Sequence, residues 1–430
     1  MTQAEQAQKN IFKQIFRAGW EDFKAKYPRY AGVDEVVQKM LGCGDPSNGY
    51  SVYICPACHE QHRVSFSCKS SFCLSCARAY GENWAEKVKA MLHPGVSYRQ
   101  LILTIPEALR TLIYHHPAPL LDGLMQAAQA ALDAAVAVAK RKRVRLGYIV
   151  VLQTAGRSGK YNRHLHVLMT DGGLTEAGEW QALGYIPYDL IHRQWQQQVL
   201  AMIEERMAGD EPALRLVALM RRRYPRGFVA HLQGDALPRL GQLTRYIVKY
   251  VVSPPMALSR IVAYDREQGT VSYWYRDHLS HQKQTETVSR ETFIGRMVQH
   301  ILPKGFQRIR YYGLQATCIL KKVRQQIGQA LPGAVQLVMV GFKTLKLTYR
   351  ERMKQAFGRD PLRCPRCGTE MWLWCIWHPD YGVIYDELQR MKAGVYERHE
   401  RPPPEPDRTR DVGLGQRPRH LQLPLPTLSV

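Results

Sequence analysis

Two pairs of side chains in this sequence have the types and spacing to do chemistry together. His164 and His166 flank one leucine in the stretch RHLHVLMT, and Tyr246 and Tyr250 are separated by three residues in RYIVKY. Residues i and i+2 of a strand point to the same face, so the two imidazoles can bind one divalent ion. Residues i and i+4 of a helix lie one above the other, so the two phenols can face one cleft.

The histidine pair needs a further ligand to hold a metal ion. Gly147 to Thr154 (GYIVVLQT) and Arg163 to Thr170 are predicted to be two strands of an antiparallel hairpin, joined by the glycine-bearing AGRSGKYN. This pairing brings Gln153 beside the histidines. Its amide oxygen would complete a three-ligand site for Mg²⁺ or Mn²⁺, with open positions for phosphate and water. The alternative is that both histidines are hydrogen-bonded structural residues of the sheet.

The tyrosine pair can supply nucleophiles. A phenol, with a pKa of roughly 10, attacks slowly near neutral pH, but a divalent ion that withdraws charge from a phosphate reduces this handicap, as can Lys249. The phosphotyrosine keeps the energy of the broken phosphodiester, so DNA strands can be rejoined without ATP. Two tyrosines allow the two linkages that strand exchange needs. The alternative is that Tyr246 and Tyr250 are edge residues of an amphipathic helix, predicted over residues 238–252.

Nine of the 10 cysteines fall into two groups that suit metal binding better than disulfides. In the first group, the CxxC knuckles Cys55–Cys58 and Cys73–Cys76 are separated by 14 residues, a spacing typical of a tetrahedral zinc ribbon. Zinc would stabilise a segment with too few apolar residues to fold alone. Ligands for a second zinc, or for an alternative ligand set, are Cys43, Cys68, His59 and His62. The alternative to metal is a set of buried free thiols.

The second cysteine group lies near the C-terminus. The knuckle Cys364–Cys367 is followed by Cys375 and His378. We expect a second small zinc site here, or else a turn without metal beside three tryptophans. The tenth cysteine, Cys318, lies in an apolar context and is predicted to be a buried, unreactive thiol.

The chain is strongly basic, with 60 Lys and Arg against 37 Asp and Glu, a formal net charge of +23 and a pI near 9.7. This excess favours binding to a polyanion. Within the two reactive motifs, Arg163, Arg245 and Lys249 are the predicted contacts to DNA. No apolar run approaches the roughly 18 residues of a membrane span, and the first residues lack a signal-peptide core. We therefore expect a cytoplasmic protein that makes no membrane contact.

The predicted elements are a mixture of helices and strands. Helical periodicity predicts helices over residues 1–40, from after Tyr80 to Met91, over 118–140 and over 187–208. Residues 97–105 are predicted to be a strand ended by Pro106, and residues 259–275 to form two further short strands. Beyond Tyr396, proline and charged residues predominate, and we expect a disordered tail.

Taken in order, these motifs resemble a known family. The order is that of the first cysteine knuckles, ILTIPEALR, GYIVVLQTAG, RHLHVLMTDGG, RYIVKYVVSPP, RIRYYGL and DPLRCPRCG. From Cys43 to Cys367 the chain resembles the two-tyrosine rolling-circle transposases of the HUH superfamily, of the insertion-sequence ninety-one family. The resemblance implies that the two histidines bind the catalytic metal and that the two tyrosines are the nucleophiles. It also implies that the N-terminal cysteines belong to a DNA-binding zinc domain.

The resemblance further implies a fold and a reaction. The expected fold is α+β, an HUH-type antiparallel sheet flanked by helices, with an N-terminal zinc-ribbon module and a small C-terminal cysteine knuckle. The expected reaction nicks and rejoins single-stranded DNA at element termini through a 5′-phosphotyrosine, and leaves a 3′-OH for the host replication machinery. The expected cofactors are structural Zn²⁺ and catalytic Mg²⁺ or Mn²⁺, and the expected location is the nucleoid.

Four segments and two alternative functions complete these expectations. The segments are 1–95 (helical segment and zinc-binding DNA-binding domain), 96–315 (catalytic domain), 316–395 (basic region with a zinc knuckle) and 396–430 (tail). One alternative is a plasmid replication initiator or relaxase with the same chemistry. The other is a non-catalytic, zinc-dependent nucleic-acid-binding protein, which cleavage of a labelled single strand would exclude.

Overall fold

A computed structural model describes residues 3–232, 254–277, 280–331, 360–393 and the positions 348, 350–351, 353–354 and 358. The chain divides into two units, Met1–Tyr385 and Asp386–Val430. Helix α13 (Glu387–Lys392) lies in the second unit. The helix predicted over residues 238–252 and the tail predicted beyond Tyr396 lie outside the described residues.

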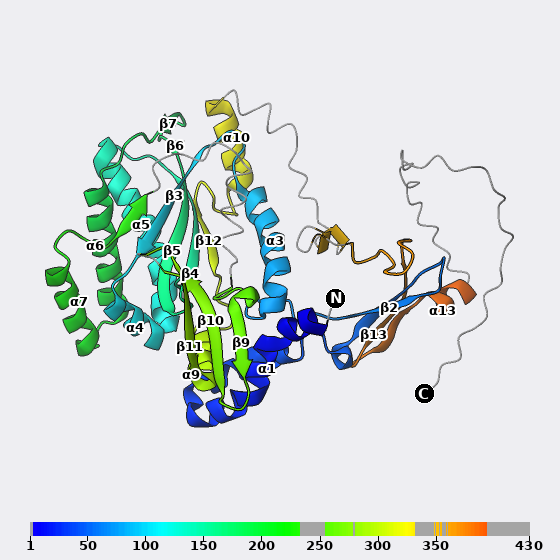
Figure 1. The fold of residues 1–430 in the computed structure, drawn as a ribbon. Helices are drawn as coiled ribbons and strands as arrows, with labels where there is room; N and C mark the ends of the chain where they lie inside the picture. Colours follow the sequence, from blue (N-terminus) through cyan, green and yellow to red (C-terminus); the bar gives the residue numbers. More distant parts are fainter. Residues whose placement is uncertain are drawn as a thin grey trace. The chain divides into compact units, whose positions relative to one another are not determined.

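The largest sheet has five strands in the order β12-β4-β5-β3-β8, and every neighbouring pair is antiparallel. Its strands are β3 (Tyr98–Thr104), β4 (Gly147–Ala155), β5 (Tyr161–Thr170), β8 (Ala230–Leu232) and β12 (Ile309–Gly313). Strand β5 is the centre strand, between β4 and β3 (Figure 1). The expected combination of helices with an antiparallel sheet is therefore confirmed.

The β4–β5 pair is the hairpin expected from the sequence. Apolar and β-branched residues dominate both strands, and such residues suit a pleated, buried surface. The connecting turn requires glycine, because Gly159 has a φ of +74° while its amide donates to the Gly156 carbonyl at 3.1 Å. In the resulting register, Gln153 and His164 are Cα partners.

Helices cover both faces of the five-stranded sheet (Figure 1). One face, which includes Val150 and Val167, packs against α4 (Glu107–His115), α5 (Pro117–Lys140), α6 (Tyr188–Arg206) and α7 (Glu211–Arg223). The other face, which includes Ile149 and Leu168, packs against α3 (Leu74–Met91) and α10 (Leu320–Ala330). Successive residues of a strand point to opposite faces, so β4 and β5 contribute to both cores.

A three-stranded sheet, in the order β11-β10-β9, forms a second core with the N-terminal helices. Its elements are β9 (Ile261–Asp265), β10 (Thr270–Arg276) and β11 (Lys283–Ser289), with α1 (Gln3–Lys26), α2 (Asp34–Leu41) and α9 (Arg290–Val298). Phe16, Trp20 and Phe293 lie in this core. The sequence predicts two of these strands but not β11, because KQTETVS contains one apolar residue and lies mostly exposed at the sheet edge.

A four-stranded sheet, which we call the ribbon sheet, has the order β14-β13-β1-β2 and joins distant parts of the chain. Its strands are β1 (Tyr50–Ile54), β2 (Gln61–Ser65), β13 (Trp372–His378) and β14 (Gly382–Asp386). Strand β1 pairs antiparallel with both β2 and β13. The smaller elements are β6 (Gly172–Leu174), β7 (Trp180–Ala182), η1 (Pro28–Val33), η2 (Pro46–Asn48) and η3 (Leu258–Arg260).

Several other expectations can be compared with the structure. The strand predicted over 97–105 is β3, and the helices predicted over 118–140 and 187–208 are α5 and α6, so these are confirmed. The predicted burial of Cys318 is wrong: the side chain is exposed in the turn between β12 and α10, while the adjacent Ile319 packs inward. Within the described ranges, none of the helices has the length and apolar content needed to cross a bilayer.

Candidate catalytic site and cysteine groups

The centre strand of the five-stranded sheet carries the histidine pair. His164 and His166 alternate with Leu165, which is buried in the α5–α6 core, so both imidazoles project from the opposite face. Their Nε2 atoms lie 3.1 Å apart. Nδ1 of His164 is 2.8 Å from the Asn162 carbonyl oxygen, which can only accept, so Nδ1 is the donor. His164 therefore presents the lone pair of Nε2 toward His166.

Gln153 lies directly across the hairpin from this pair. It is the Cα partner of His164, and side chains opposite one another on antiparallel strands lie side by side on one face. Gln153 is buried, and its Nε2 has no hydrogen-bond partner among the described residues. The amide nitrogen only donates, so a ligand role belongs to the amide oxygen of the same side chain. The structure thus brings the three predicted ligands together.

Burial and nearby positive charge keep both imidazoles neutral. Burial is the main reason that the pKa of His164 lies below its ordinary value. Burial, together with His164 and the charge of Arg308, lowers the pKa of His166 to about 3. Arg110 adds to the effect on His164. Neutral imidazole is the form that binds metal ions, so this electrostatic setting suits a ligand role at physiological pH.

The donor set fits a divalent ion. Two imidazole nitrogens at about 2.1 Å from one ion, at a near-right angle, would be about 3 Å apart, close to the 3.1 Å between the two Nε2 atoms. Among the described residues, no third His, Cys, Asp or Glu joins the two histidines, and the strand register places the Gln153 amide beside them. Two nitrogens and an amide oxygen leave positions for phosphate and water.

Arg163 does not lie where a DNA contact requires. Its side chain is 3% exposed, and Nη1 donates to the Ile113 carbonyl at 3.0 Å. The guanidinium also lies 4.9 Å from the ring centroid of Tyr161. As the neighbour of His164 on a strand, it points to the opposite face and fastens α4 to the sheet. The expectation of direct DNA binding by Arg163 is therefore corrected to a structural role.

Three residues near the histidine pair were not expected from the sequence. Arg308 donates from Nε to the Leu152 carbonyl at 2.9 Å, and Arg110 donates from Nε to the Ile105 carbonyl at 3.0 Å. His231 of β8 is the Cα partner of Ile102, which is also the partner of His166 in β3. His231 therefore stands on the same face, two strands away, and its side chain is exposed. A sequence signal existed only for Arg308, which directly precedes the strand motif IRYYG.

The predicted nucleophiles lie outside the described residues. Tyr246 and Tyr250, with the predicted DNA contacts Arg245 and Lys249, belong to residues 233–253. The described chain stops before this stretch at Leu232, the last residue of β8. Strand β8 pairs with β3, which in turn pairs with the histidine-bearing β5. The roles of these four residues stay predictions.

One group of four thiols lies at the start of α3. Its members, whose sulfurs all lie within 4.8 Å of one another, are Cys43, Cys68, Cys73 and Cys76. The Sγ atoms of Cys43 and Cys76 are 3.3 Å apart, and the amide of Cys68 donates to Cys43 Sγ at 3.4 Å. Hydrogen bonds from the other three thiols, Cys68 foremost, hold the pKa of Cys43 far below its ordinary value. Four sulfurs at these spacings have the composition of a structural zinc site.

A second group of four thiols corrects the expected pairing of the knuckles. Its members, again within 4.8 Å of one another, are Cys55, Cys58, Cys364 and Cys367. The sequence predicts that Cys55–Cys58 and Cys73–Cys76 share one site, but in the structure the two knuckles belong to different groups. The expectation is wrong because β1 pairs with β13, which brings together residues 306 positions apart such as Cys58 and Cys364. Cys375 is not part of either group.

Comparison with known proteins shows the family. Residues 147–323 match the family model described as "Putative transposase", and residues 15–105 match the "Transposase zinc-binding domain" of the insertion-sequence ninety-one type. This chain belongs to the insertion-sequence ninety-one family of transposases. Its family implies an enzyme that cleaves and transfers DNA strands, with a rolling-circle mechanism. The first match begins at β4 and includes the histidine pair, and the second ends in the region of β3.

Two curated relatives are similar to this transposase over most of their length. The "Transposase for insertion sequence element IS801" of Pseudomonas savastanoi pv. phaseolicola is 29% identical over 354 residues, which cover 78% of this chain and 82% of the relative. "Putative transposase y4qJ" of Sinorhizobium fredii (strain NBRC 101917 / NGR234) is 26% identical over 373 residues, which cover 82% of this chain and 92% of the relative. No solved structure matches this transposase.

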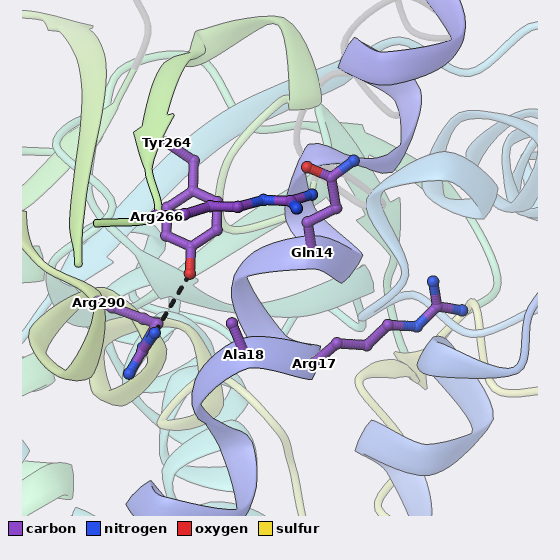
Figure 2. A pocket seen from close by; sticks show the side chains of 6 residues that line it. All are labelled: Gln14, Arg17, Ala18, Tyr264, Arg266 and Arg290. Carbon is purple, nitrogen blue, oxygen red and sulfur yellow. Dashed lines mark hydrogen bonds between the residues drawn. The ribbon is translucent and has the colours of Figure 1, made fainter. Parts of the chain in front are cut away.

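A basic pocket of about 430 Å³ lies between α1, β9 and the start of α9 (Figure 2). None of its six lining residues is acidic: Gln14, Arg17, Ala18, Tyr264, Arg266 and Arg290. Arg290 donates to the Tyr264 hydroxyl at 3.4 Å, while Arg17 extends away from Arg266 (Figure 2). The guanidinium groups do not converge on one point, so the pocket adds positive charge to the surface of this transposase without forming a discrete site.

Proposed function

We propose that this transposase nicks and rejoins single-stranded DNA at the termini of its element by HUH chemistry. The observation that carries the proposal is the group of His164, His166 and Gln153 on adjacent antiparallel strands, with 3.1 Å between the two histidine Nε2 atoms. The group lies on the centre strands of an antiparallel sheet covered by helices, the arrangement expected of the HUH fold.

The three side chains would hold Mg²⁺ or Mn²⁺. When bound, the ion supplies charge withdrawal from the scissile phosphate and fixes its orientation. The protein supplies the rest of the setting. His164 and His166 are kept neutral by burial, while Arg110 and Arg308 add positive charge that favours the approach of a phosphate. The rigid sheet limits how far the ligands can move.

Tyr246 and Tyr250 are the proposed nucleophiles. The phenol oxygen of one of them attacks the scissile phosphorus, an O–P bond forms, and the bond from phosphorus to the 3′ oxygen breaks. The phenol loses its proton, the departing 3′ oxygen gains one, and the products are a 5′-phosphotyrosine and a free 3′-OH. The 3′-OH is available to the host replication machinery. The second tyrosine would form the second linkage that strand exchange requires. Arg245 and Lys249, in the same segment, would contact the DNA backbone.

The other segments of the chain would have roles that support this reaction. Cys43, Cys68, Cys73 and Cys76 would bind a structural zinc ion in the DNA-binding N-terminal region, in keeping with the zinc-domain match. Residues 96–315 would form the catalytic domain, between the zinc-binding segment 1–95 and the basic segment 316–395. The reaction would take place on nucleoid DNA in the cytoplasm. The relatives are transposases, which favours this function over a plasmid initiator, a relaxase or a non-catalytic binding protein.

Cleavage of a labelled single strand from the element terminus tests the proposal. In Mn²⁺ or Mg²⁺, the protein should cut the strand, and EDTA should stop the reaction. The double variant His164→Ala/His166→Ala should lose at least about 10³-fold in rate, since several kcal/mol of transition-state stabilisation depend on the ion. Its thermal unfolding should change little. Full activity of the double variant in Mn²⁺ would refute the metal role. The control His115→Ala, at an exposed residue that ends α4, should cleave normally.

A further inference from the structure

The two cysteine knuckles of the second thiol group have the same backbone geometry. In the N-terminal knuckle, the amide of Cys55 donates to the Glu60 carbonyl at 2.9 Å, and the amide of His59 donates to the Cys55 carbonyl at 3.0 Å. His59 has a left-handed φ of 59°. This turn aims both cysteine sulfurs of the knuckle to one side, the usual arrangement for a metal ligand pair.

The C-terminal knuckle repeats each of these features at the equivalent position. The amide of Cys364 donates to the Thr369 carbonyl at 2.8 Å, and the amide of Gly368 donates to the Cys364 carbonyl at 2.9 Å. Gly368 has a φ of 72°. The flanking residues pair alike as well, since Ile54 pairs with Gln61 and Arg363 bridges to Glu370. Each knuckle is therefore the tip of a hairpin.

The four sulfurs converge in the way that one tetrahedral ion requires. Cys55 Sγ lies 3.4 Å from Cys367 Sγ, and Cys58 Sγ lies 3.5 Å from Cys364 Sγ. Four thiolates at about 2.3 Å from zinc would be about 3.8 Å apart. Both of these contacts join one knuckle to the other, and each knuckle supplies two sulfurs, so neither has a complete ligand set by itself.

The ribbon sheet has little else to hold it together. Its buried residues are Cys55, Cys364 and Met371, with Tyr53 and Cys58 partly buried beside them. All five residues of β1 are half-buried. A small sheet with so few buried apolar side chains is marginal in water, and a metal ion commonly supplies the missing stability.

We propose that Cys55, Cys58, Cys364 and Cys367 bind a zinc ion of their own and thereby build one zinc ribbon from two hairpins at opposite ends of the chain. Binding converts four thiols to thiolates and releases their protons. In Figure 1 the orange strand β13 joins the blue N-terminal hairpin. The zinc-domain match ends at residue 105 and the other match at 323, so neither includes the C-terminal half of this site. The C-terminal segment is then an obligatory part of the zinc-binding module.

Zinc stoichiometry in a cycle of serine variants of the full chain tests this site. The wild type should contain two zinc ions per chain. Cys55→Ser/Cys58→Ser and Cys364→Ser/Cys367→Ser should each contain one, and the quadruple variant should also contain one, because both pairs remove the same ion. A quadruple variant that contains no zinc would show that the two pairs remove different ions and would overturn the proposal. An unchanged zinc content after Cys364→Ser/Cys367→Ser would overturn it as well. Cys318→Ser and Cys375→Ser, at cysteines outside the group, should retain two ions.

Cobalt substitution of the wild type keeps the proposal testable if the variants do not fold. Two Co²⁺ ions per chain, each with the strong sulfur-to-metal absorption of a four-thiolate site, are expected. Binding of a single Co²⁺ ion, or a second ion with the weaker absorption of a mixed nitrogen–sulfur site, would contradict it.

Discussion

The five-stranded sheet and the ribbon sheet are held together by different means. The first eight residues of β4 are buried, and both faces of its sheet pack against helices through apolar side chains. The ribbon sheet has three buried residues, two of which are cysteines. Apolar burial stabilises the first sheet by roughly 25 cal/mol per Å². The ribbon sheet depends on its thiol group.

The proposed catalytic ligands and the zinc ligands proposed for the ribbon sheet therefore lie on sheets that are stabilised in different ways. The histidine pair lies on the sheet that apolar burial stabilises, so the proposed catalytic ligands keep their positions whether or not zinc is bound. The zinc-binding strands can gain or lose their structure with the metal. Zinc should therefore control the shape of the ribbon sheet without altering the geometry of the proposed catalytic ligands.

Zinc removal should show the largest difference between the two sheets. We expect that the apo protein, with thiols kept reduced, loses hydrogen-exchange protection in β1, β2 and β13 by more than about 10³-fold, because structural zinc contributes roughly 10 kcal/mol or more. Amides of β4 and β5 should keep their protection within about tenfold. The measurement is hydrogen exchange with mass spectrometry. Retained protection of β1 in zinc-free protein would show that the ribbon sheet folds without metal.

Tryptophan truncation provides the next largest contrast. Trp195 of α6 is fully buried and donates from Nε1 to the Thr104 carbonyl at 2.7 Å. We expect Trp195→Ala to reduce the free energy of unfolding by about 3–5 kcal/mol, as measured by urea denaturation. The matched change Trp377→Ala, at a half-buried ring stacked on Tyr50 in the ribbon sheet, should cost about 1 kcal/mol in zinc-loaded protein. Equal losses would contradict the contrast.

The sequence predicts the five-stranded sheet and its helices better than it predicts the ribbon sheet. The β4–β5 hairpin, and with it the position of Gln153 beside His164, could be predicted because both strands and their turn lie within 25 residues of sequence. Helices α5 and α6 could be predicted from their apolar periodicity. Such features depend on local patterns and on pairing between neighbours.

The thiol pairing could not be predicted, because it depends on contacts between distant residues. Sequence spacing favours a site shared by Cys58 and Cys73, but β1 pairs with β13, and this pairing brings Cys364 beside Cys58 instead. Arg163 was misassigned for a simpler reason: its burial follows from packing against α4, which the motif does not reveal. Arg110 and Arg308 likewise reach the histidines only in the folded chain.

A smaller effect is the pH dependence of stability that the buried His93 causes. Its Nε2 lies 2.9 Å from the Leu314 carbonyl, and burial lowers its pKa to about 4. The unfolded chain, with a histidine pKa of about 6.5, binds the proton more readily, so stability present above pH 6.5 is lost as the pH falls toward 4. Between pH 7 and pH 5 we expect this group to account for about 2 kcal/mol.

The variant His93→Gln isolates this contribution. Its destabilisation relative to the wild type, measured by urea denaturation, should shrink by that amount between pH 7 and pH 5. The matched variant His62→Gln, at an exposed residue of the ribbon sheet, should leave the pH dependence unchanged. A parallel loss of stability in wild type and His93→Gln would show that other groups cause the acid sensitivity.

Covalent capture of DNA tests the central claim most directly. The transposase is incubated with Mn²⁺ and a single-stranded oligonucleotide that spans the element terminus, and the SDS-stable adduct is digested for mass spectrometry. The adduct should map to Tyr246 or Tyr250. The double variant Tyr246→Phe/Tyr250→Phe should fold, bind the oligonucleotide and form no adduct, while each single variant should still form some. An adduct on any other residue, or one that persists in the double variant, would contradict the two-tyrosine mechanism.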